Sequence, residues 1–525
     1  MLKGQWLTAK DILRVQAVKY AHKVGIKDLY KSYTYKQWNE RTCRLANALA
    51  DLGLKKGDRF AALGYNCVEW MEIYAAAAKG GFICVPLMFR LAGPEMEYIL
   101  NHCEAEIMIV QEDWIEHTNG MKKNLPTVKH YISFGVQNPH FDGYLSYEDI
   151  IAKVSPEEPA VQVNPEDPWF IMYTGGTTGL PKGVVKSHEA LFAQYFIEIY
   201  DHDYKEDDTI LLVMPCCHVN SLYYAFPCTW LGATIMAYNM VNFKPEDLLK
   251  TFSDHKITMT SLVPTHYIMM LALPDEVKAK YDLNSIKKLV ISSAPARRDT
   301  KLGILKMFPN SELYEAYGST EAGMVTILKP HEQLTKLGSC GREAMGTDLI
   351  RFYDEDGNLV TEPNKVGELY SRSPMLLTTY WKAPEKLAAS MKGDYFTSGD
   401  LGMKDEDGYV FLVDRKANMI ISGGENIFPS EIENVVGGYE KVKDVAVIGV
   451  PHEKWGETVQ AIIVLHEGQT ATAEEITEYC RGKIAGYKVP KQIVFIRDEE
   501  MPRSGAGKIL HRILREKYGM WKDHQ

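Results

Sequence analysis

Strand-like and helix-like stretches alternate along the first part of the chain, and this alternation constrains the fold more than any other feature. Residues 45–54 carry apolar side chains at helical spacing, and residues 60–63 form a short apolar stretch. The same order repeats in residues 68–78 and 82–87. Strands and helices that alternate at these lengths predict a parallel sheet with helices on its faces. We therefore expect an α/β fold.

A second series of apolar stretches predicts another α/β layer. Helix-length segments separate its members, which are residues 170–173, 210–214, 234–237, 259–263 and 289–291. After about Gly338, short strands and the turn dipeptides Asp356-Gly357 and Asp407-Gly408 predict hairpins and a small β-barrel-like part. The chain then returns to helix and strand patterns in residues 430–436, 445–450 and 461–465.

Chain length and a change in sequence pattern together predict two domains. The 525 residues exceed the roughly 250–300 residues at which a single core stops growing. A charged, glycine-bearing stretch begins at Asp414, and we place the boundary there. We expect a large N-terminal domain of layered α/β subdomains over residues 1–414 and a small, mobile α+β C-terminal domain over residues 415–525.

Composition excludes several classes of protein. The net charge of −10 argues against a nucleic-acid partner, because such proteins concentrate positive charge on one face. A run of about 18 apolar residues is missing, so we expect no membrane span. The nine cysteines are scattered without C-x-x-C spacing, which favours free thiols in the cytoplasm over disulfides or a zinc site.

Residues 173–183, YTGGTTGLPKG, form the most informative segment of the sequence. Glycines let main-chain N–H groups approach phosphate oxygens, threonine hydroxyls add donors, and one lysine adds a positive charge. The segment is not a Walker A loop, because Pro181 precedes Lys182 where that pattern requires a glycine. A lone glycine-rich stretch also fits a flexible surface loop, so the prediction depends on the full combination.

The whole segment resembles the phosphate loop of the acyl-adenylate-forming superfamily, which includes acyl-CoA synthetases, luciferases and the adenylation domains of peptide synthetases. Gly175 stands where the superfamily usually has a serine. The resemblance continues in order along nearly the whole chain. It implies an ATP site in this segment formed by Thr174, Gly175, Gly176, Thr177, Thr178, Gly179 and Lys182.

Residues 315–321, EAYGSTE, resemble a second motif of the superfamily. The resemblance implies that Tyr317 stacks on adenine, Thr320 contacts phosphate and Glu321 binds Mg²⁺. A turn with a buried tyrosine would explain the motif if it stood alone. The implied nucleotide-binding residues are Glu315, Ala316, Tyr317 and Gly318 in this motif, and Ser293, Ala294 and Pro295 in a segment that resembles the adenosine-side loop.

Two further segments resemble the TGD and GR motifs of the superfamily. Ser398 is inserted in the first, and Asp414 occupies the usual glycine position of the second. The resemblance implies that Asp400 accepts hydrogen bonds from the ribose hydroxyls and that Arg415 lies near the ribose. A Gly-Asp pair alone more often marks a turn.

Residues 416–431 resemble the loop that enters the active site for the second half-reaction. Gly423 and Gly424 permit close approach of the main chain to a ligand, and Glu425 belongs to the same loop. Ala417 occupies the hinge position, which is commonly Asp or Lys in the superfamily. The residue that absorbs the domain rotation is therefore left open.

Lys508 lies in a basic, glycine-rich segment. Taken alone, this segment would indicate a solvated tail. The resemblance implies that its ammonium bridges the substrate carboxylate and the α-phosphate, whose negative charges repel each other. The implied reaction has two steps. A carboxylate attacks the α-phosphorus of MgATP and releases pyrophosphate, and a thiol then displaces AMP. Positioning and charge stabilisation supply the catalysis.

The acyl site is implied by a motif that contains His218, where a ring gates the pocket. A lone histidine is usually structural, and the motif match favours the acyl site. The implied pocket residues are mostly apolar: His218, Val219, Asn220, Val263, Pro264 and Met324. Residues 213–230 contain no carboxylate, so an amino-acid substrate, whose ammonium group would be buried without a counter-charge, is disfavoured.

We therefore expect an acyl-CoA synthetase that uses ATP, Mg²⁺ and coenzyme A and acts on a medium-chain, alicyclic or aromatic acid. The implied catalytic residues are Lys508, Thr320, Glu321 and His218. A transfer to a carrier protein and a luciferase-like oxygenation remain alternatives. A regulatory nucleotide-binding module is less consistent with the presence of Lys508 and Glu321. A P-loop hydrolase is less consistent with the sequence because the Walker A pattern is absent. A homodimer is compatible with the superfamily.

Overall fold

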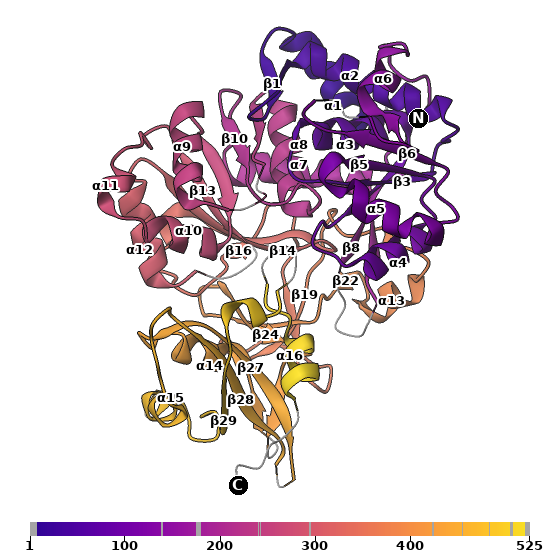
Figure 1. Ribbon diagram of the computed structural model, residues 1–525. Helices are drawn as coiled ribbons and strands as arrows, with labels where there is room; N and C mark the ends of the chain where they lie inside the picture. Colours follow the sequence, from indigo (N-terminus) through magenta and orange to yellow (C-terminus); the bar gives the residue numbers. More distant parts are fainter. Residues whose placement is uncertain are drawn as a thin grey trace. The chain divides into compact units, whose positions relative to one another are not determined.

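The computed structural model describes residues 8–137, 140–174, 180–239, 241, 243–292, 296–422, 425–453, 455–481, 483–503 and 508–519 (Figure 1). The chain divides into two compact units. The first comprises residues 1–350 and 371–396, and the second comprises residues 351–370 and 397–525. The mixed α/β architecture with a large and a smaller part confirms the predicted fold class.

The first unit contains an eight-stranded sheet in the order β20-β9-β8-β4-β3-β5-β6-β7. Strands β8, β4, β3, β5, β6 and β7 run parallel, whereas β9 pairs antiparallel with both β8 and β20. The strands are β3 (Arg59–Leu63), β4 (Ile83–Leu87), β5 (Ile107–Gln111), β6 (His130–Phe134), β7 (Leu145–Ser146), β8 (Pro168–Thr174), β9 (Lys182–Ser187) and β20 (Thr379–Tyr380). The first predicted parallel sheet is thus confirmed.

A nine-stranded sheet in the order β16-β15-β14-β13-β12-β10-β11-β1-β2 forms the other layer of this unit. Its parallel strands are β1 (Val24–Lys27), β10 (Thr209–Leu212), β11 (Thr234–Ala237), β12 (Met259–Leu262), β13 (Lys288–Ser292) and β14 (Glu312–Ser319). Its antiparallel strands are β2 (Ser32–Thr34) at one edge, and β15 (Gly323–Leu328) and β16 (Arg342–Glu343) at the other end of the sheet. Four members of the second predicted series are confirmed in this sheet, whereas the prediction for residues 170–173 was wrong, because they form β8 of the eight-stranded sheet.

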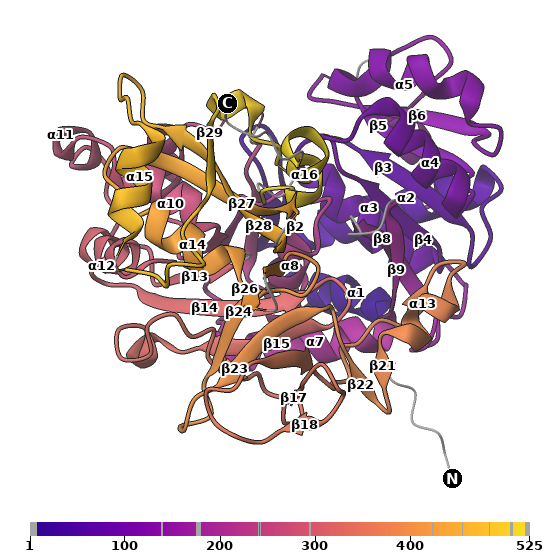
Figure 2. The ribbon, with the colours of Figure 1, turned by 90° about the horizontal axis from the view of Figure 1, so that it is seen from below.

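Alternate residues of this sheet enter two different cores, as the two-residue period of a strand requires. Leu211, Leu289 and Ile291 pack with residues of α9, α10 and α12. Ile210 and Val290 enter the larger core that contains α3 and α8. Helices α10 and α12 accordingly lie beside β13 (Figures 1 and 2).

Helices surround both sheets. They are α1 (Ala9–Lys19), α2 (Tyr35–Asp51), α3 (Val68–Gly80), α4 (Gly93–Cys103), α5 (Ile115–Met121), α6 (Tyr147–Ala152), α7 (His188–Asp201), α8 (Val219–Leu231), α9 (Pro245–His255), α10 (Pro264–Leu271), α11 (Asp275–Lys278), α12 (Arg298–Met307) and α13 (Pro384–Ala389). A small hairpin, β21 (Met391–Lys392) and β22 (Tyr395–Phe396), completes the unit. Among the described helices, none is both long and apolar enough to cross a membrane.

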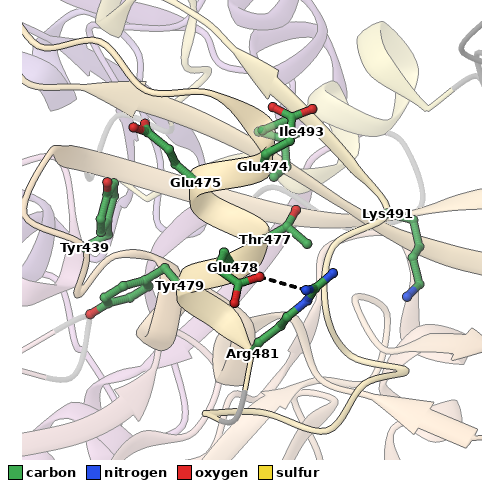
Figure 3. A pocket seen from close by; sticks show the side chains of 10 residues that line it. Tyr439, Glu474, Glu475, Thr477, Glu478, Tyr479, Arg481, Lys491 and Ile493 are labelled. Atoms are coloured by element: carbon green, nitrogen blue, oxygen red, sulfur yellow. Dashed lines mark ion pairs between the residues drawn. The ribbon is translucent and has the colours of Figure 1, made fainter.

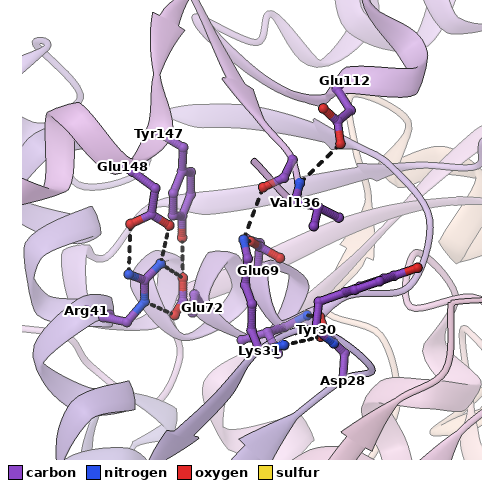
Figure 4. A network of polar contacts seen from close by, with 12 residues as sticks. Asp28, Tyr30, Lys31, Arg41, Glu69, Glu72, Glu112, Val136, Tyr147 and Glu148 are labelled. Atoms are coloured by element: carbon purple, nitrogen blue, oxygen red, sulfur yellow. Dashed lines mark hydrogen bonds and ion pairs between the residues drawn. The ribbon is translucent and has the colours of Figure 1, made fainter. Parts of the chain in front are cut away.

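Helix α3 is buried on all sides, and its charged residues therefore need partners. Glu72 receives two hydrogen bonds from Arg41 and one from the hydroxyl of Tyr147 (Figure 4). Arg41 also forms a two-point ion pair with Glu148, at 2.7 and 2.9 Å. These contacts fix α3 to α2 and α6.

The second unit begins with an antiparallel sheet in the order β18-β17-β19-β23-β24. Its strands are β17 (Arg351–Tyr353), β18 (Leu359–Val360), β19 (Gly367–Tyr370), β23 (Asp400–Lys404) and β24 (Val410–Arg415). Gly357 and Gly408 have φ values of 80° and 82°, a conformation that suits glycine in a tight turn. Both predicted hairpins are confirmed.

The rest of this unit is a second sheet with helices against it. Strands β26, β25, β28 and β27 follow in that order, and β29 pairs parallel with β28. The elements are β25 (Ile420–Ser422), β26 (Glu425–Ile427), β27 (Val442–His452), β28 (Gly456–Leu465), β29 (Gln492–Phe495), α14 (Pro429–Val436), α15 (Ala473–Cys480) and α16 (His511–Tyr518). The boundary at residues 414 and 415 and the mobility of the C-terminal domain stay predictions.

All nine cysteines are buried and free, as the sequence predicted. Burial raises the pKa of Cys84 and Cys228 and raises that of Cys43 to about 12, so their thiols stay protonated near neutral pH.

Candidate active site

The acyl-site candidates lie after the carboxyl ends of neighbouring parallel strands. His218 follows β10 and is the N-cap residue of α8, where its Nδ1 accepts a hydrogen bond from the N–H of Asn220 at 3.3 Å. Val263 directly follows β12 and is the N-cap residue of α10, and Pro264 occupies the first helical position, which proline favours. Ligands bind at this end of open parallel sheets, so the position suits a binding site.

A chain of hydrogen bonds joins these segments. The side-chain amide of Asn220 donates to Ser292 Oγ at 2.7 Å, and Ser292 Oγ lies 3.0 Å from Ser261 Oγ. Asn66 holds the segment before His218, because its amide donates to the carbonyl of Met214 at 2.8 Å and its Oδ1 accepts from the N–H of Cys216 at 2.6 Å. Asn66 belongs to no motif in the sequence and was missed.

The predicted phosphate loop connects β8 to β9 as a hairpin, with Thr174 paired to Lys182. Strand β9 follows the glycine-rich segment, and helix α7 begins after this strand at His188. Eight predicted nucleotide-binding residues lie outside the described residues: Gly175, Gly176, Thr177, Thr178, Gly179, Ser293, Ala294 and Pro295.

Glu321 meets the phosphate hairpin directly. It lies in the turn between β14 and β15, and its Oε1 accepts hydrogen bonds from Thr174 Oγ1 at 3.2 Å and from the hydroxyl of Tyr380 at 3.3 Å. The Lys182 ammonium lies 5.3 Å from the centre of the Tyr380 ring. The structure therefore brings three predicted residues together and adds Tyr380, which the sequence analysis missed.

The turn that carries Thr320 and Glu321 is tightly packed. A Cβ added to Gly318 would lie 2.2 Å from the carbonyl oxygen of Gly323. Gly323 has a φ of +75°, and Ser319 Oγ accepts from the N–H of Ala322 at 3.0 Å. Glycine is needed at position 318 because a side chain has no space there. It is needed at position 323 because of the backbone conformation.

Lys186 on β9 is a second residue that the sequence analysis missed. Its ammonium donates to the main-chain carbonyl of Glu321 at 2.9 Å and to that of Met375. Burial lowers the pKa of Lys186 to about 7, although the Glu321 carboxylate acts in the opposite direction. A lysine inside the valine-rich stretch 183–187 was the only signal in the sequence.

Glu315 has a partner other than a nucleotide. Its carboxylate lies 2.6 Å from the ammonium of Lys301, and both side chains are buried. Burial raises the pKa of Glu315, and Lys301 offsets part of this effect. Two other candidates lie on the same strand, where Ala316 pairs with Ser292 and Tyr317 pairs with Thr326. Their predicted contacts with nucleotide stay predictions.

Met324 is the second residue of β15, the strand that follows the Glu321 turn. Its side chain is buried, and its N–H donates to Gln194 Oε1 of α7 at 3.1 Å. Met324, an acyl-site candidate, is only three residues beyond Glu321 in the sequence. The two predicted subsites of the first unit are therefore adjacent along one hairpin.

The second unit brings Asp400 and Arg415 together. Arg415 Nε lies 2.7 Å from Asp400 Oδ1, and Ser398 Oγ donates to Asp400 Oδ2 at 2.7 Å. The inserted Ser398 thus orients the carboxylate predicted to hold the ribose. Lys508 is exposed, and Glu425 pairs with Ser422 across the β25–β26 hairpin. Gly423 and Gly424 lie outside the described residues.

Oxygen ligands around Glu321 fit Mg²⁺, although the described residues contain no group of three or more potential His, Cys, Asp or Glu ligands. Mg²⁺ is commonly held by one or two carboxylates together with substrate phosphates. Glu321 lies beside the phosphate hairpin and meets this requirement. The donor set around Glu321 therefore fits the ion.

A pocket on the second unit lies apart from all predicted site residues. Its lining includes the ion pair of Glu478 with Arg481 at 2.8 Å (Figure 3). Tyr439 and Tyr479 close one side with ring centres 4.9 Å apart. None of the ten lining residues is a candidate of the sequence analysis, and no role is assigned to this pocket.

Two family profiles match the chain. The profile of the AMP-binding enzyme matches residues 13–381, and that of the AMP-binding enzyme C-terminal domain matches residues 431–508. Together they account for most of both units.

Curated relatives and a solved structure match nearly the whole length. The chain is 34% identical over 491 residues to a long-chain-fatty-acid–CoA ligase of Mycobacterium tuberculosis. The aligned region covers 92% of this chain and 93% of the relative. It is 34% identical over 497 residues to the indoleacetate–CoA ligase of Aromatoleum aromaticum, with 93% of each chain covered. An anthranilate CoA ligase solved with anthranoyl-AMP superposes with a TM-score of 0.88 at 26% identity and 98% coverage of each chain.

Proposed function

Because the chain belongs to the family of AMP-binding enzymes, we propose that it activates a carboxylic acid with ATP and transfers the acyl group to coenzyme A. The predicted superfamily membership is confirmed, and the chain is an AMP-forming acid–thiol ligase. The full-length similarity to CoA ligases of different acids carries this proposal.

The first step joins the acid to AMP. A substrate carboxylate oxygen attacks the α-phosphorus, the bond to the bridging oxygen breaks, and pyrophosphate leaves. In our proposal Thr174, Lys182 and Thr320 hold the phosphates, and Lys508 offsets the charge of the approaching anions. Glu321 would hold Mg²⁺, which supplies further positive charge to the phosphates when bound.

The second step forms the thioester. The thiolate of coenzyme A attacks the acyl carbon, and AMP leaves with both electrons of the broken carbon–oxygen bond. We assign Gly423, Gly424 and Glu425 to this step, and Asp400 and Arg415 to the ribose. The contact between Asp400 and Arg415 supports the assignment because it preorganises the carboxylate.

The acid in our proposal is medium-chain, alicyclic or aromatic. Val219, Val263 and Met324 supply apolar surface, whereas Asn220 is already engaged with Ser292. The absence of a carboxylate from residues 213–230 argues against an α-amino acid. Transfer to a carrier protein or to oxygen remains the alternative second step. The cytoplasmic location and a homodimer stay predictions.

Pyrophosphate release with MgATP across a panel of acids tests the proposal. The panel runs from acetate and butyrate through octanoate, cyclohexanecarboxylate and benzoate to phenylalanine, each with and without CoA. We expect release with one class of larger apolar acid and a thioester only when CoA is present. Release without thioester would favour another acceptor, and release independent of every acid would contradict adenylation.

A further inference from the structure

Lys186 is a charged residue inside an otherwise apolar part of β9. The residue is 1% exposed and lies next to the buried Val185. Burial of an ammonium group is unfavourable unless hydrogen bonds compensate for the lost water. Methionine or leucine would occupy similar space without this penalty, so the contacts of the ammonium distinguish lysine from these residues.

Those contacts tie two separate segments to β9. The ammonium donates to the main-chain carbonyl of Glu321 at 2.9 Å and to the main-chain carbonyl of Met375. The same carbonyl of Glu321 accepts the N–H of Leu377 at 2.8 Å. Lys186 therefore fixes the main chain of the residue whose carboxylate faces Thr174 and Tyr380.

Gln194 holds the same turn from a second element. Its Oε1 accepts the N–H of Met324 at 3.1 Å, and its Nε2 donates to Glu198 at 2.6 Å. A Cβ on Gly323 would lie 2.4 Å from Gln194 Oε1 and 2.7 Å from the Cβ of Met375. The turn thus fits closely between the residues that Lys186 and Gln194 hold, and β9 and α7, which carry them, are consecutive in the chain.

We propose that Lys186 is a positioning residue for adenylation, which fixes the main chain of Glu321 so that the carboxylate faces the phosphate hairpin. The inference rests on the proposed function for its catalytic consequence. The proposal that Lys186 fixes the main chain of Glu321 does not depend on that function, because every contact that supports it is made between residues of the chain. Lys186 contacts neither ATP nor acid in this proposal and acts through Glu321.

Lys186→Met tests the proposal, with Lys79→Met as a matched control. Lys79 is also 1% exposed, and its ammonium lies 2.7 Å from both carboxylate oxygens of Glu158, in a different part of the first unit. Both variants remove a buried ammonium, but only Lys186→Met releases the Glu321 turn. Lys186→Gln retains an N–H donor and serves as the milder variant if Lys186→Met folds poorly.

Hydrogen exchange of the ligand-free protein gives the first readout. We expect the amides of Met324 and Leu377 to exchange about tenfold faster in Lys186→Met than in the wild type, and less than that in Lys186→Gln. Lys79→Met should leave both amides unchanged. Unchanged exchange at both amides in the two Lys186 variants, or equal acceleration in Lys79→Met, would overturn the proposal.

Steady-state kinetics give the second readout. We expect Lys186→Met to raise the KM for MgATP about tenfold and to lower kcat, while the KM for the acid stays within twofold. Equal changes in both KM values would indicate general loosening and overturn the positioning role. If the wild-type protein releases no pyrophosphate with any acid, the proposed function fails, and hydrogen exchange still decides whether Lys186 holds the turn.

Discussion

Lys79 and Glu158 form a two-point ion pair, in which the buried ammonium lies 2.7 Å from each oxygen of a partly exposed carboxylate. Burial raises the pKa of Glu158, but the Lys79 ammonium and hydrogen bonds from Lys79 and Asn39 outweigh burial, so the pKa falls below its ordinary value of 4.5. The ionised carboxylate therefore stabilises the fold above the pKa of the unfolded chain. This stability is lost as pH falls through the lower, folded-state pKa.

Glu158→Gln should lower the free energy of unfolding by about 3 kcal/mol at pH 7, because it leaves the Lys79 ammonium buried without a counter-charge. The difference from the wild type should narrow as pH falls through the lowered pKa of Glu158, where its carboxylate becomes protonated. Urea unfolding between pH 3 and pH 7 measures both effects. The exposed Glu116 of α5 supplies the control, and a parallel loss of stability in Glu116→Gln would contradict the assignment.

Tyr380→Phe should lower the rate of pyrophosphate release about five- to tenfold. The change removes the hydroxyl that donates to Glu321 Oε1 but keeps the ring near Lys182, a loss of about 1 kcal/mol for one hydrogen bond. Initial rates at saturating acid measure the effect. Tyr395 is equally buried and donates to Asp348 at 2.7 Å, so Tyr395→Phe should leave the rate nearly unchanged.

Gly318→Ala should abolish adenylation and lower stability by about 2 kcal/mol or more. Its Cβ would lie 2.2 Å from the rigid main chain at Gly323, so the β14–β15 turn must move and displace Glu321. Thermal unfolding and pyrophosphate release measure the two consequences. Gly120 of α5 has open space around its Cβ position, so Gly120→Ala should preserve activity and raise stability slightly. Full activity in Gly318→Ala would contradict the role of this close contact.

Lys508→Ala should abolish acid-dependent exchange between ATP and pyrophosphate, because no other group is assigned to bridge the carboxylate and the α-phosphate. Lys508→Arg should not restore full activity, since a planar guanidinium presents its charge over a broader fork. The exchange assay with the preferred acid measures both variants. Unchanged exchange in Lys508→Ala would remove Lys508 from the first step.

Gly424→Leu is the counterpart of Lys508→Ala for the second step. A bulky side chain on the predicted thioester loop should block the approach of coenzyme A but spare pyrophosphate exchange. Transfer from supplied acyl-AMP to CoA measures this step. The opposite pattern, with lost exchange and normal transfer, would reverse the assignment of the two segments.

Local pattern was sufficient to predict several strands of the two large sheets. The stretch 259–263 is apolar and of strand length, and the structure contains β12 at Met259–Leu262. The strand β9 was harder to predict, because its pairing with β8 and β20 decides its conformation. This antiparallel pairing brings Lys182 opposite Thr174 at the two ends of the glycine-rich segment.

In the candidate site, too, local sequence identifies some residues and only the fold identifies others. Motif resemblance singled out Thr174 and Glu321, which the structure joins although 147 residues separate them. Tyr380 and Asn66 act through contacts with distant segments, and no local spacing identifies them. The sequence analysis did not single out Lys186, and only the fold reveals that its acceptors are the carbonyls of Glu321 and Met375.

The burial of all nine native thiols makes the protein suited to site-specific labelling. Maleimide reagents react with exposed thiolates, so the folded chain should give a low background. One cysteine introduced on an exposed face of each unit would then accept a fluorophore selectively. Energy transfer between two such dyes during turnover would test the predicted rotation of the C-terminal domain between the half-reactions, without removal of any natural cysteine.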